Sequence, residues 1–294
     1  MIGDLFGLGS AFTWALVSVL LRALQSRTDA LSLNAIRSLV AAVLALAAVV
    51  ATGRAAALND VPIPTIAFLV ASVLAGMGIG DTLYFYSLRL VGVARGLLLS
   101  NAYPIYVAII AALLLGERIT VGLLAGTTLV MLGVGLVLIP SRALLVKPES
   151  GSGKNERLGV MLAVAAGFFW ACATVLVKIG AQEVDGLVAA TIRLIAATSA
   201  LMLASRFSRS GLQLGEYRGK QLLGTAAAGV VGLVSSLTFL LAVQFTGAAK
   251  TATLTSTAPL FGVPMSLLLG EKLTWQTVLG STVSVAGIWL VVAM

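Results

Sequence analysis

The chain has 294 residues, of which 59% are hydrophobic and only 10% are charged. A soluble domain usually carries about 25% charged residues, so this composition excludes an ordinary water-facing surface and indicates that lipid surrounds most of the chain. The net charge of +8 lies mostly in loops and at segment ends, which favours topology signals and anionic lipid headgroups over nucleic acid as a partner.

Residue types that carry much of enzyme and metal chemistry are scarce. Histidine is absent and Cys172 is the single cysteine, which excludes an internal disulfide, a zinc site of the usual kind and catalysis by a histidine base. The sequence therefore predicts no enzyme, no metal and no cofactor. Cys172 lies in an apolar run and is expected to be a small buried residue.

Ten apolar segments are long enough to cross a bilayer, which takes about 20 helical residues. Residues 1–20 lack a basic region and a cleavage site, so the first segment is expected to be a retained helix and not a signal peptide. Near-continuous apolarity favours helices over the alternating strands of a barrel. The predicted spans are 5–24, 33–52, 65–89, 92–115, 121–139, 158–180, 187–205, 221–245, 248–269 and 275–293.

The chain also aligns with itself across its middle. The longest polar stretch, residues 147–157, is typical of a flexible linker between two similar halves. The matches include Phe12 and Trp14 with Phe168 and Trp170, Arg37 with Arg193, Pro104 with Pro259, LLLGERIT (113–120) with LLLGEKLT (267–274), and Gly126 and Gly133 with Gly280 and Gly287.

Each half contains five predicted spans, and five is odd, so the second half must cross the membrane in the opposite sense. Such inverted repeats are common in secondary transporters. The predicted fold is an all-α integral membrane protein with ten transmembrane helices in two inverted five-helix repeats, at residues 1–140 and 158–294, joined by a polar linker at 141–157. A duplication kept only for stability is the alternative.

With these features the chain resembles the EamA family of the drug/metabolite transporter superfamily, over nearly all of both halves. The resemblance rests on the paired tryptophans, arginines and prolines above, on YFYSLRLVGVARG (84–96) and on the two Gly-Glu turns at 116–117 and 270–271. It implies a transporter of small metabolites, amino acids among them. It names no substrate, because the family's members share no substrate signature.

Asp81 is the one carboxylate predicted to lie well inside a span, about 12 Å deep at 1.5 Å per residue. A carboxylate at that depth is costly and should face a cavity or a basic residue. It can bind a cationic group, or it can take up and release a proton. The alternative is a structural partner for Arg89, Arg95 or another basic residue. Ser236 holds the matching position in the second half, so any such role is asymmetric.

Pro104 and Pro259 are predicted to kink their helices in mid-span, because proline lacks an N–H and leaves a carbonyl four residues earlier unbonded. Polar residues surround both, so we expect these helices to line a cavity, unless Ser and Thr side chains satisfy a packed kink. Trp14 and Trp170 lie too deep for the interfacial belt and are expected to line a pocket or to pack in the core. The candidate substrate-binding residues are Trp14, Asp81, Tyr84, Ser100, Asn101, Tyr103, Trp170, Phe239 and Thr255.

Three further pairs have a structural and a functional interpretation. Arg37 and Arg193 can snorkel to the headgroups, or they can attract a substrate carboxylate or hold the opposite half. Glu117 and Glu271 are expected to face water in structural turns. The glycines at 126/133 and 280/287 can brace the bundle or form a dimer face, since small residues let helices approach closely.

The leading hypothesis is an alternating-access carrier for a small amphipathic metabolite such as an amino acid, with efflux as the expected direction, in the cytoplasmic membrane. A channel, an intramembrane enzyme and a non-transporting protein are the alternatives, and the oligomer is a monomer or a homodimer. The loops after odd-numbered spans hold thirteen Lys and Arg residues against four after even-numbered spans, which places the odd loops in the cytoplasm and both termini outside. Many relatives are thought to have both termini inside.

Overall fold

The computed structural model describes residues 1–24, 30–91, 96, 99–138, 153–207, 218–268 and 274–293. Within these residues every regular element is a helix, which confirms the predicted all-α class. The elements are α1 (Ile2–Leu24), α2 (Ala30–Ala51), α3 (Ala55–Asn59), α4 (Ile63–Val73), the π-helix η2 (Leu74–Gly80), α5 (Asp81–Val91), α7 (Tyr103–Leu115), α8 (Val121–Leu138), α9 (Gly153–Ala181), α10 (Gly186–Arg206), α11 (Lys220–Thr246), α12 (Ala248–Thr255), α13 (Ala258–Leu268) and α14 (Trp275–Val292).

Eight helical segments of the described chain are long and apolar enough to cross a membrane. Each overlaps one of the predicted spans, because sustained apolarity over about 20 residues is the strongest signal that a membrane helix leaves in a sequence. The chain is therefore a multi-span helical membrane protein. The eight segments are 2–20, 32–51, 63–84, 121–138, 156–181, 186–206, 220–246 and 275–292.

The other two predicted spans, 92–115 and 248–269, contain breaks. A turn at Asn101–Ala102 precedes α7, which has only 13 residues. A turn at Ser256–Thr257 separates α12 from α13, which have 8 and 11 residues. None of these pieces alone reaches the length of a bilayer, so a crossing at either place needs consecutive pieces in series. Ten crossings therefore remain a prediction.

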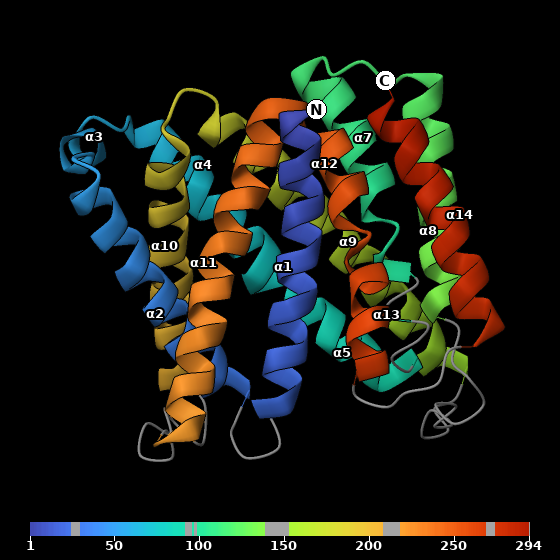
Figure 1. The fold of residues 1–294 in the computed structure, drawn as a ribbon, viewed down its shortest axis with the longest axis horizontal. Coiled ribbons are helices and arrows are strands. Elements are labelled where there is room, and N and C mark those ends of the chain that lie inside the picture. Colours follow the sequence, from blue (N-terminus) through green and yellow to red (C-terminus); the bar gives the residue numbers. More distant parts are fainter. Residues whose placement is uncertain are drawn as a thin grey trace.

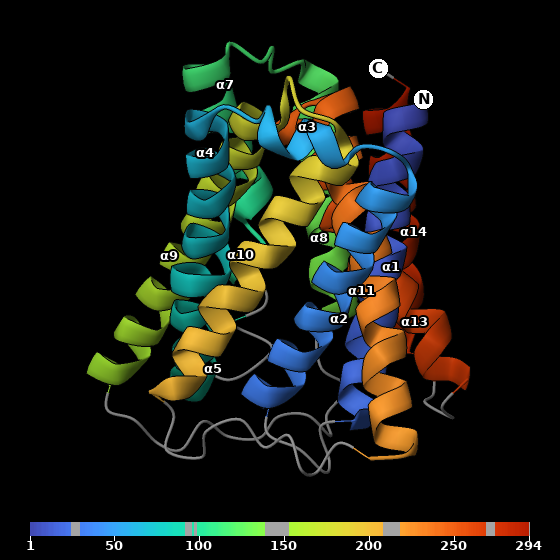
Figure 2. The same cartoon turned by 90° about the vertical axis from the view of Figure 1, so that its left-hand side faces the viewer.

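Both chain termini lie at the same end of the bundle, which we call the termini face (Figure 1). The end at which α1 finishes and α9 begins is the opposite face. The long helices run between these two ends, as the view turned by 90° also shows (Figure 2). Helices from the two halves alternate within the bundle: α1 packs against α11, α2 against α10, and α4 and α5 against α9.

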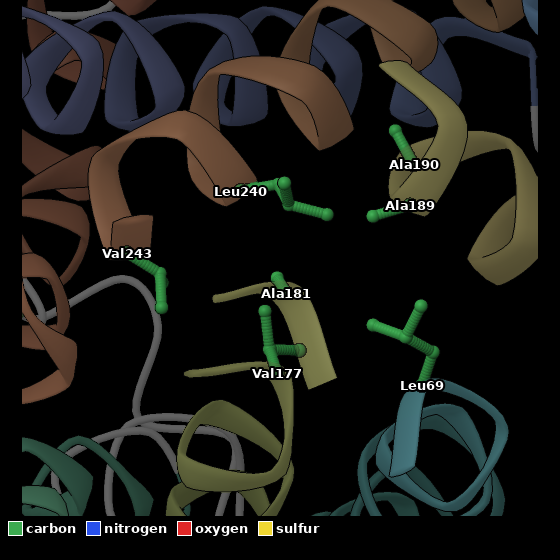
Figure 3. Close-up of a cluster of buried hydrophobic side chains, with 7 residues drawn as sticks. All are labelled: Leu69, Val177, Ala181, Ala189, Ala190, Leu240 and Val243. Atoms are coloured by element: carbon green, nitrogen blue, oxygen red, sulfur yellow. The ribbon is translucent and has the colours of Figure 1, made fainter. Parts of the chain in front are cut away.

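The largest cluster of buried side chains lies where four helices meet (Figure 3). Leu69 of α4 in the first half packs against residues of α9, α10 and α11 in the second half, and all of these side chains are fully buried. The two halves therefore share a hydrophobic core. The cluster consists of Leu69, Val177, Ala181, Ala189, Ala190, Leu240 and Val243.

The glycines spaced seven apart bring α8 and α14 into direct backbone contact. A Cβ atom on Gly126 would lie 2.8 Å from the carbonyl oxygen of Gly287, and one on Gly133 would collide with Gly280. The pairing of 126 with 287 and of 133 with 280 means that the two helices run antiparallel. These glycines therefore face each other inside one chain. Of the two interpretations given above, bracing of the bundle fits this contact, because the glycine surface is already covered by the partner helix and is not open to a second copy.

The ends of α9 and α11 at the termini face cap each other. Lys178 Nζ of α9 donates to the carbonyl oxygens of Val243 and Gln244 at 3.0 and 3.2 Å. In return, Gln244 Nε2 of α11 donates to the carbonyl oxygens of Ala181 and Val184. The last carbonyls of a helix lack partners within it, and these two side chains supply them. Lys178 thus lies inside α9 and makes an internal contact.

Candidate functional site

Asp81 begins α5 directly after the π-helix η2. Such π-helical turns are rare and occur frequently at functional sites, because the extra residue in the turn redirects the side chains that follow it. Three glycines, at 76, 78 and 80, lie within η2. The structure thus places the half-buried carboxylate at an irregular point of a membrane-spanning segment, Ile63–Tyr84, and not on a regular helical face.

Trp170 of α9 holds this carboxylate from the other half of the chain. Its Nε1 donates to Asp81 Oδ1 at 2.8 Å. Close approach of the indole requires glycine at position 80, since a Cβ there would lie 2.7 Å from Trp170 Cδ1 and 2.9 Å from Nε1. Trp170 and Asp81, both predicted to belong to the site, are therefore brought together and fixed in orientation.

Two tyrosines complete an aromatic enclosure around Trp170. The rings of Tyr84 and Trp170 have centroids 5.2 Å apart with a 53° tilt, and the ring of Tyr103 meets Trp170 edge-on at 6.4 Å. The Tyr103 hydroxyl donates to the carbonyl oxygen of Ala252 at 2.9 Å and lies 2.8 Å from the Thr255 hydroxyl. Five of the nine candidate residues, Asp81, Tyr84, Tyr103, Trp170 and Thr255, thus form one connected cluster, which we call the Asp81 cluster.

Asp81 has no cationic partner in the part of the chain that the structure describes, where Trp170 is the one side chain that bonds its carboxylate. The alternative of a structural pair with Arg95 falls on a residue outside the described ones, as does the Arg89 side chain. A carboxylate in a membrane span without a countercharge is expensive and is a mark of function.

Trp14, the counterpart of Trp170, lies apart from this cluster but on the inner side of α1. Its side chain is 55% exposed, yet Ser10, Ala11 and Val17, which share its face, are 4%, 0% and 1% exposed. Residues three and four apart lie on the same side of a helix, so Trp14 faces the bundle interior and not the lipid. Ser18, one turn further on toward the opposite face, is exposed as well.

Phe239 and Arg193 form a second contact, and Arg37 lies buried on α2. The Arg193 guanidinium lies 5.7 Å from the centre of the Phe239 ring, and its Nε donates to Ser72 Oγ of the first half at 3.2 Å. Arg37 is only 9% exposed and donates to Asn34 Oδ1 at 3.1 Å. Arg37 therefore does not snorkel to the headgroups, and Arg193 holds the opposite half, as the sharper interpretation proposed.

The prolines begin helices and do not kink continuous ones. Pro104 and Pro259 are each the second residue of a helix, α7 and α13, where the missing N–H is not needed. Ser100, 1% exposed, donates to the carbonyl oxygen of Gly96, and Asn101 lies in the turn before α7. The hydroxyls of α12 and of the turn after it likewise donate to backbone carbonyls three or four residues earlier. Ser and Thr side chains therefore satisfy these segments internally, as the second interpretation expected, and the segments fit a cavity wall less well. Their donors are Thr251, Thr253, Thr255, Ser256 and Thr257.

Glu117 was expected to face water, and the structure corrects this. Its carboxylate accepts hydrogen bonds from the backbone N–H groups of Ala248 and Ala249 at 2.7 and 3.1 Å, at the first turn of α12 in the other half. Gly247 adopts φ of 88° and leaves room for the carboxylate, because a Cβ there would lie 2.8 Å from Glu117 Oε1. The repeated Gly-Glu turn signalled this role, but its partner lies more than a hundred residues away.

Two ion pairs join the halves on the same face. Asp4 Oδ1 lies 2.8 Å from Lys250 Nζ, with Asp4 buried, and Arg54 Nε lies 3.5 Å from Asp185 Oδ2 in a more exposed setting. Together with Glu117 on α12 we call these the termini-face contacts. Each connects a residue before 118 to one after 184, so they close one end of the interface between the halves.

Comparison with known proteins shows the family to which the chain belongs. The described part of the chain has eight helical segments long and apolar enough to cross a membrane, and Asp81 lies within one of them. The profile of the EamA-like transporter family matches residues 1–139 and again residues 157–293, so the chain belongs to that family. This confirms the resemblance inferred from the paired motifs.

One curated protein and one solved structure are similar to nearly the whole chain. An uncharacterized transporter of Archaeoglobus fulgidus is 25% identical over 99% of this chain and 98% of its own length. A crystal structure of a protein that is 18% identical superimposes with a TM-score of 0.81 over 98% of this chain and 95% of its own, which supports the fold. The protein is thus a multi-pass membrane protein of a transporter family.

Proposed function

We propose that the protein is a secondary transporter that moves a small amphipathic metabolite, such as an amino acid, across the cytoplasmic membrane by alternating access, with efflux as the direction. One observation carries this proposal. The halves are joined at the termini face by Glu117 and two ion pairs, while Trp14 is exposed on the inner side of α1 toward the opposite face. A central site closed at one end and open at the other is one of the two states that alternating access requires.

The proposed inverted repeat accounts for the second state. When each residue is replaced by its counterpart in the other half, the contact of Gly126 with Gly287 becomes the contact of Gly280 with Gly133, which the structure also contains. The same relation connects two aromatic pairs, Phe12 with Phe261 and Tyr106 with Phe168. Contacts that exchange under the repeat are expected of halves related by a twofold axis in the membrane plane. Exchange of their conformations would open the termini face and close the opposite one.

Charge supports the cytoplasmic position of the opposite face. Of the four cations assigned to the termini face by sequence, Lys178, Lys250 and Arg54 make contacts within the chain, and Arg118 is exposed. The opposite face carries thirteen Lys and Arg residues by sequence. By the positive-inside rule, this asymmetry supports termini outside the cytoplasm.

The proposal is tested by counterflow in proteoliposomes that contain the purified protein and a panel of labelled amino acids, amines and nucleosides, with and without a pH gradient. Saturable accumulation of one solute class, driven by unlabelled solute inside, is expected of a carrier. Flux that rises linearly with concentration and shows no counterflow would support a channel instead. No flux beside a working control carrier would favour a non-transporting protein.

Asp81 is the candidate proton carrier, since it is an acidic residue inside a span and no cation among the described residues pairs with it. Asp81→Asn is expected to abolish the effect of the pH gradient on transport, because an amide cannot release a proton. Asp60→Asn, an exposed aspartate between α3 and α4, is the matched control and should transport like the wild type. An Asp81→Asn variant with unchanged pH dependence would contradict the proton role.

A further inference from the structure

The Asp81 cluster has the chemistry of a receptor for positive charge. In the eight described spans, Asp81 is the acidic residue that lies away from a helix end, and Trp170 alone bonds it. Asp4, the acidic residue near the end of the first span, is by contrast paired with Lys250. Among the described residues, no cation therefore pairs with the Asp81 carboxylate.

Two hydrogen-bond donors of the same cluster are already engaged and do not offer themselves to an anion. The indole N–H of Trp170 is occupied by Asp81 itself, and the hydroxyl of Tyr103 is directed to Ala252 and Thr255 of α12. Tyr103 therefore presents its ring to Trp170 and not its hydroxyl. A solute carboxylate at this place would meet the Asp81 charge without a compensating donor from these residues.

The aromatic rings add an attraction of their own. The rings of Tyr84 and Tyr103 are each inclined to the Trp170 ring, with centroids 5.2 and 6.4 Å from its centroid. The faces of such rings are negative and attract cations within about 6 Å, Trp most strongly. Tyr84 lies three residues after Asp81 and so on the same side of α5, beside the carboxylate.

We propose that Asp81 with the rings of Trp170, Tyr84 and Tyr103 forms a subsite for an organic cation, the ammonium group of the transported solute. The carboxylate supplies the charge, the rings supply shape and cation–π attraction, and Trp170 fixes the carboxylate in orientation through its Nε1. This inference rests on the proposed transport function and names the substrate class of the same site: amines and quaternary ammonium compounds with an apolar body, in preference to anions.

The test is equilibrium binding to the purified full-length protein in nanodiscs, measured by isothermal titration. The probes are benzyltrimethylammonium, its neutral isostere neopentylbenzene and the anion benzenesulfonate. The quaternary cation has no proton to exchange, so its binding reports charge and ring contacts alone. We expect saturable binding of the cation, at least tenfold tighter than either other probe. Equal binding of the cation and the neutral isostere would overturn the proposal.

Substitutions test whether the cation binds at the Asp81 cluster. Asp81→Asn should weaken cation binding by roughly 30-fold or more, as expected for removing one partner of a desolvated charge pair. Trp170→Phe keeps a ring but removes the N–H, and should weaken it by roughly tenfold. Unchanged affinity in Asp81→Asn overturns the proposal. Asp81→Glu, which keeps the charge, should bind better than Asp81→Asn and shows that the loss is not one of folding.

Two glycines of η2 give a matched pair. A Cβ on Gly80 collides with the Trp170 indole, whereas a Cβ on Gly78 has no atom within 4 Å. Gly80→Ala should therefore weaken cation binding like Trp170→Phe, and Gly78→Ala should bind like the wild type. Equal losses in both would contradict the role of the indole in orienting Asp81.

The binding and transport experiments distinguish failure of the subsite proposal from failure of the carrier proposal. Counterflow of anions or neutral solutes without cation binding would overturn the subsite and leave the carrier proposal standing. Cation binding that depends on Asp81, in a protein without counterflow of any solute, would support the subsite and overturn the carrier proposal.

Discussion

Gly287→Leu is expected to separate α14 from α8 and to lower the thermal stability of the detergent-solubilised protein. A Cβ at this position would lie 2.7 Å from both the carbonyl oxygen of Gly126 and the amide nitrogen of Val130. Backbone atoms cannot rotate away as a side chain can, so the cost should reach or exceed the upper end of the usual overpacking range, about 3 kcal/mol. The apparent Tm should fall by roughly 6–12 °C in a thermal unfolding assay that uses neither a thiol-reactive probe nor any other dye.

Gly262→Leu is the matched control, because a Cβ there has no atom within 4 Å. It introduces the same side chain into a helix, α13, and should change the Tm little. Equal Tm values for the two variants would contradict the close contact of α8 with α14. A Gly287→Leu protein of unchanged Tm but altered mass in light scattering would indicate that the glycine face serves association between copies.

The spans were predictable because each depends on local composition. Eight of the ten coincide with long apolar helices, and only their ends differ. The breaks before Pro104 and Pro259 were foreseen as kinks, but the extent of the interruption was not. It depends on turns at Asn101–Ala102 and Ser256–Thr257, where neighbouring hydroxyls compete for backbone carbonyls and the proline begins a new helix.

The site was predictable in its residue types but not in its pairing. Asp81, Trp170, Tyr84 and Tyr103 were each candidates, since polar and aromatic groups deep in a span stand out. The repeat treats Trp14 and Trp170 as equivalent, however, and Trp170 alone faces a carboxylate. Trp14 is exposed where the second half has Ser236 in place of Asp81. That asymmetry is visible in the sequence, but the 2.8 Å bond across the halves is a tertiary contact.

Glu117 shows a different limit of sequence reasoning. A glutamate beside an arginine in a Gly-Glu turn has the pattern of a solvated charge, and Gly116 does adopt the left-handed φ of 66° that such a bend needs. The partner of the carboxylate is backbone, the first N–H groups of α12. Backbone donors leave no mark in the sequence, so a cap supplied by a distant segment cannot be recognised from side-chain types.

Glu117→Ala is expected to loosen the first turn of α12 and with it the closed termini face. The carboxylate satisfies two N–H groups that the helix itself cannot pair and lies at the positive end of the helix dipole. Loss of a side-chain cap costs about 0.5–2 kcal/mol, so hydrogen exchange of the amides in Ala248–Thr255 should accelerate by a factor of roughly 2 to 30. Exchange measured by mass spectrometry on this peptide reports the change directly.

Glu183→Gln, an exposed glutamate on the same face, is the control and should leave this exchange unchanged. The ion pair of Asp4 with Lys250 holds the same turn of α12 from α1, so adding Asp4→Asn to Glu117→Ala should accelerate exchange by more than the product of the single effects. Strictly multiplicative effects would mean that the two contacts act independently. Unaltered exchange in the double variant would show that neither contact closes this end.

If the closure of the termini face depends on these contacts, the Glu117→Ala carrier should spend less time open to the opposite face. Its counterflow rate should then change, and that of the Glu183→Gln control should not.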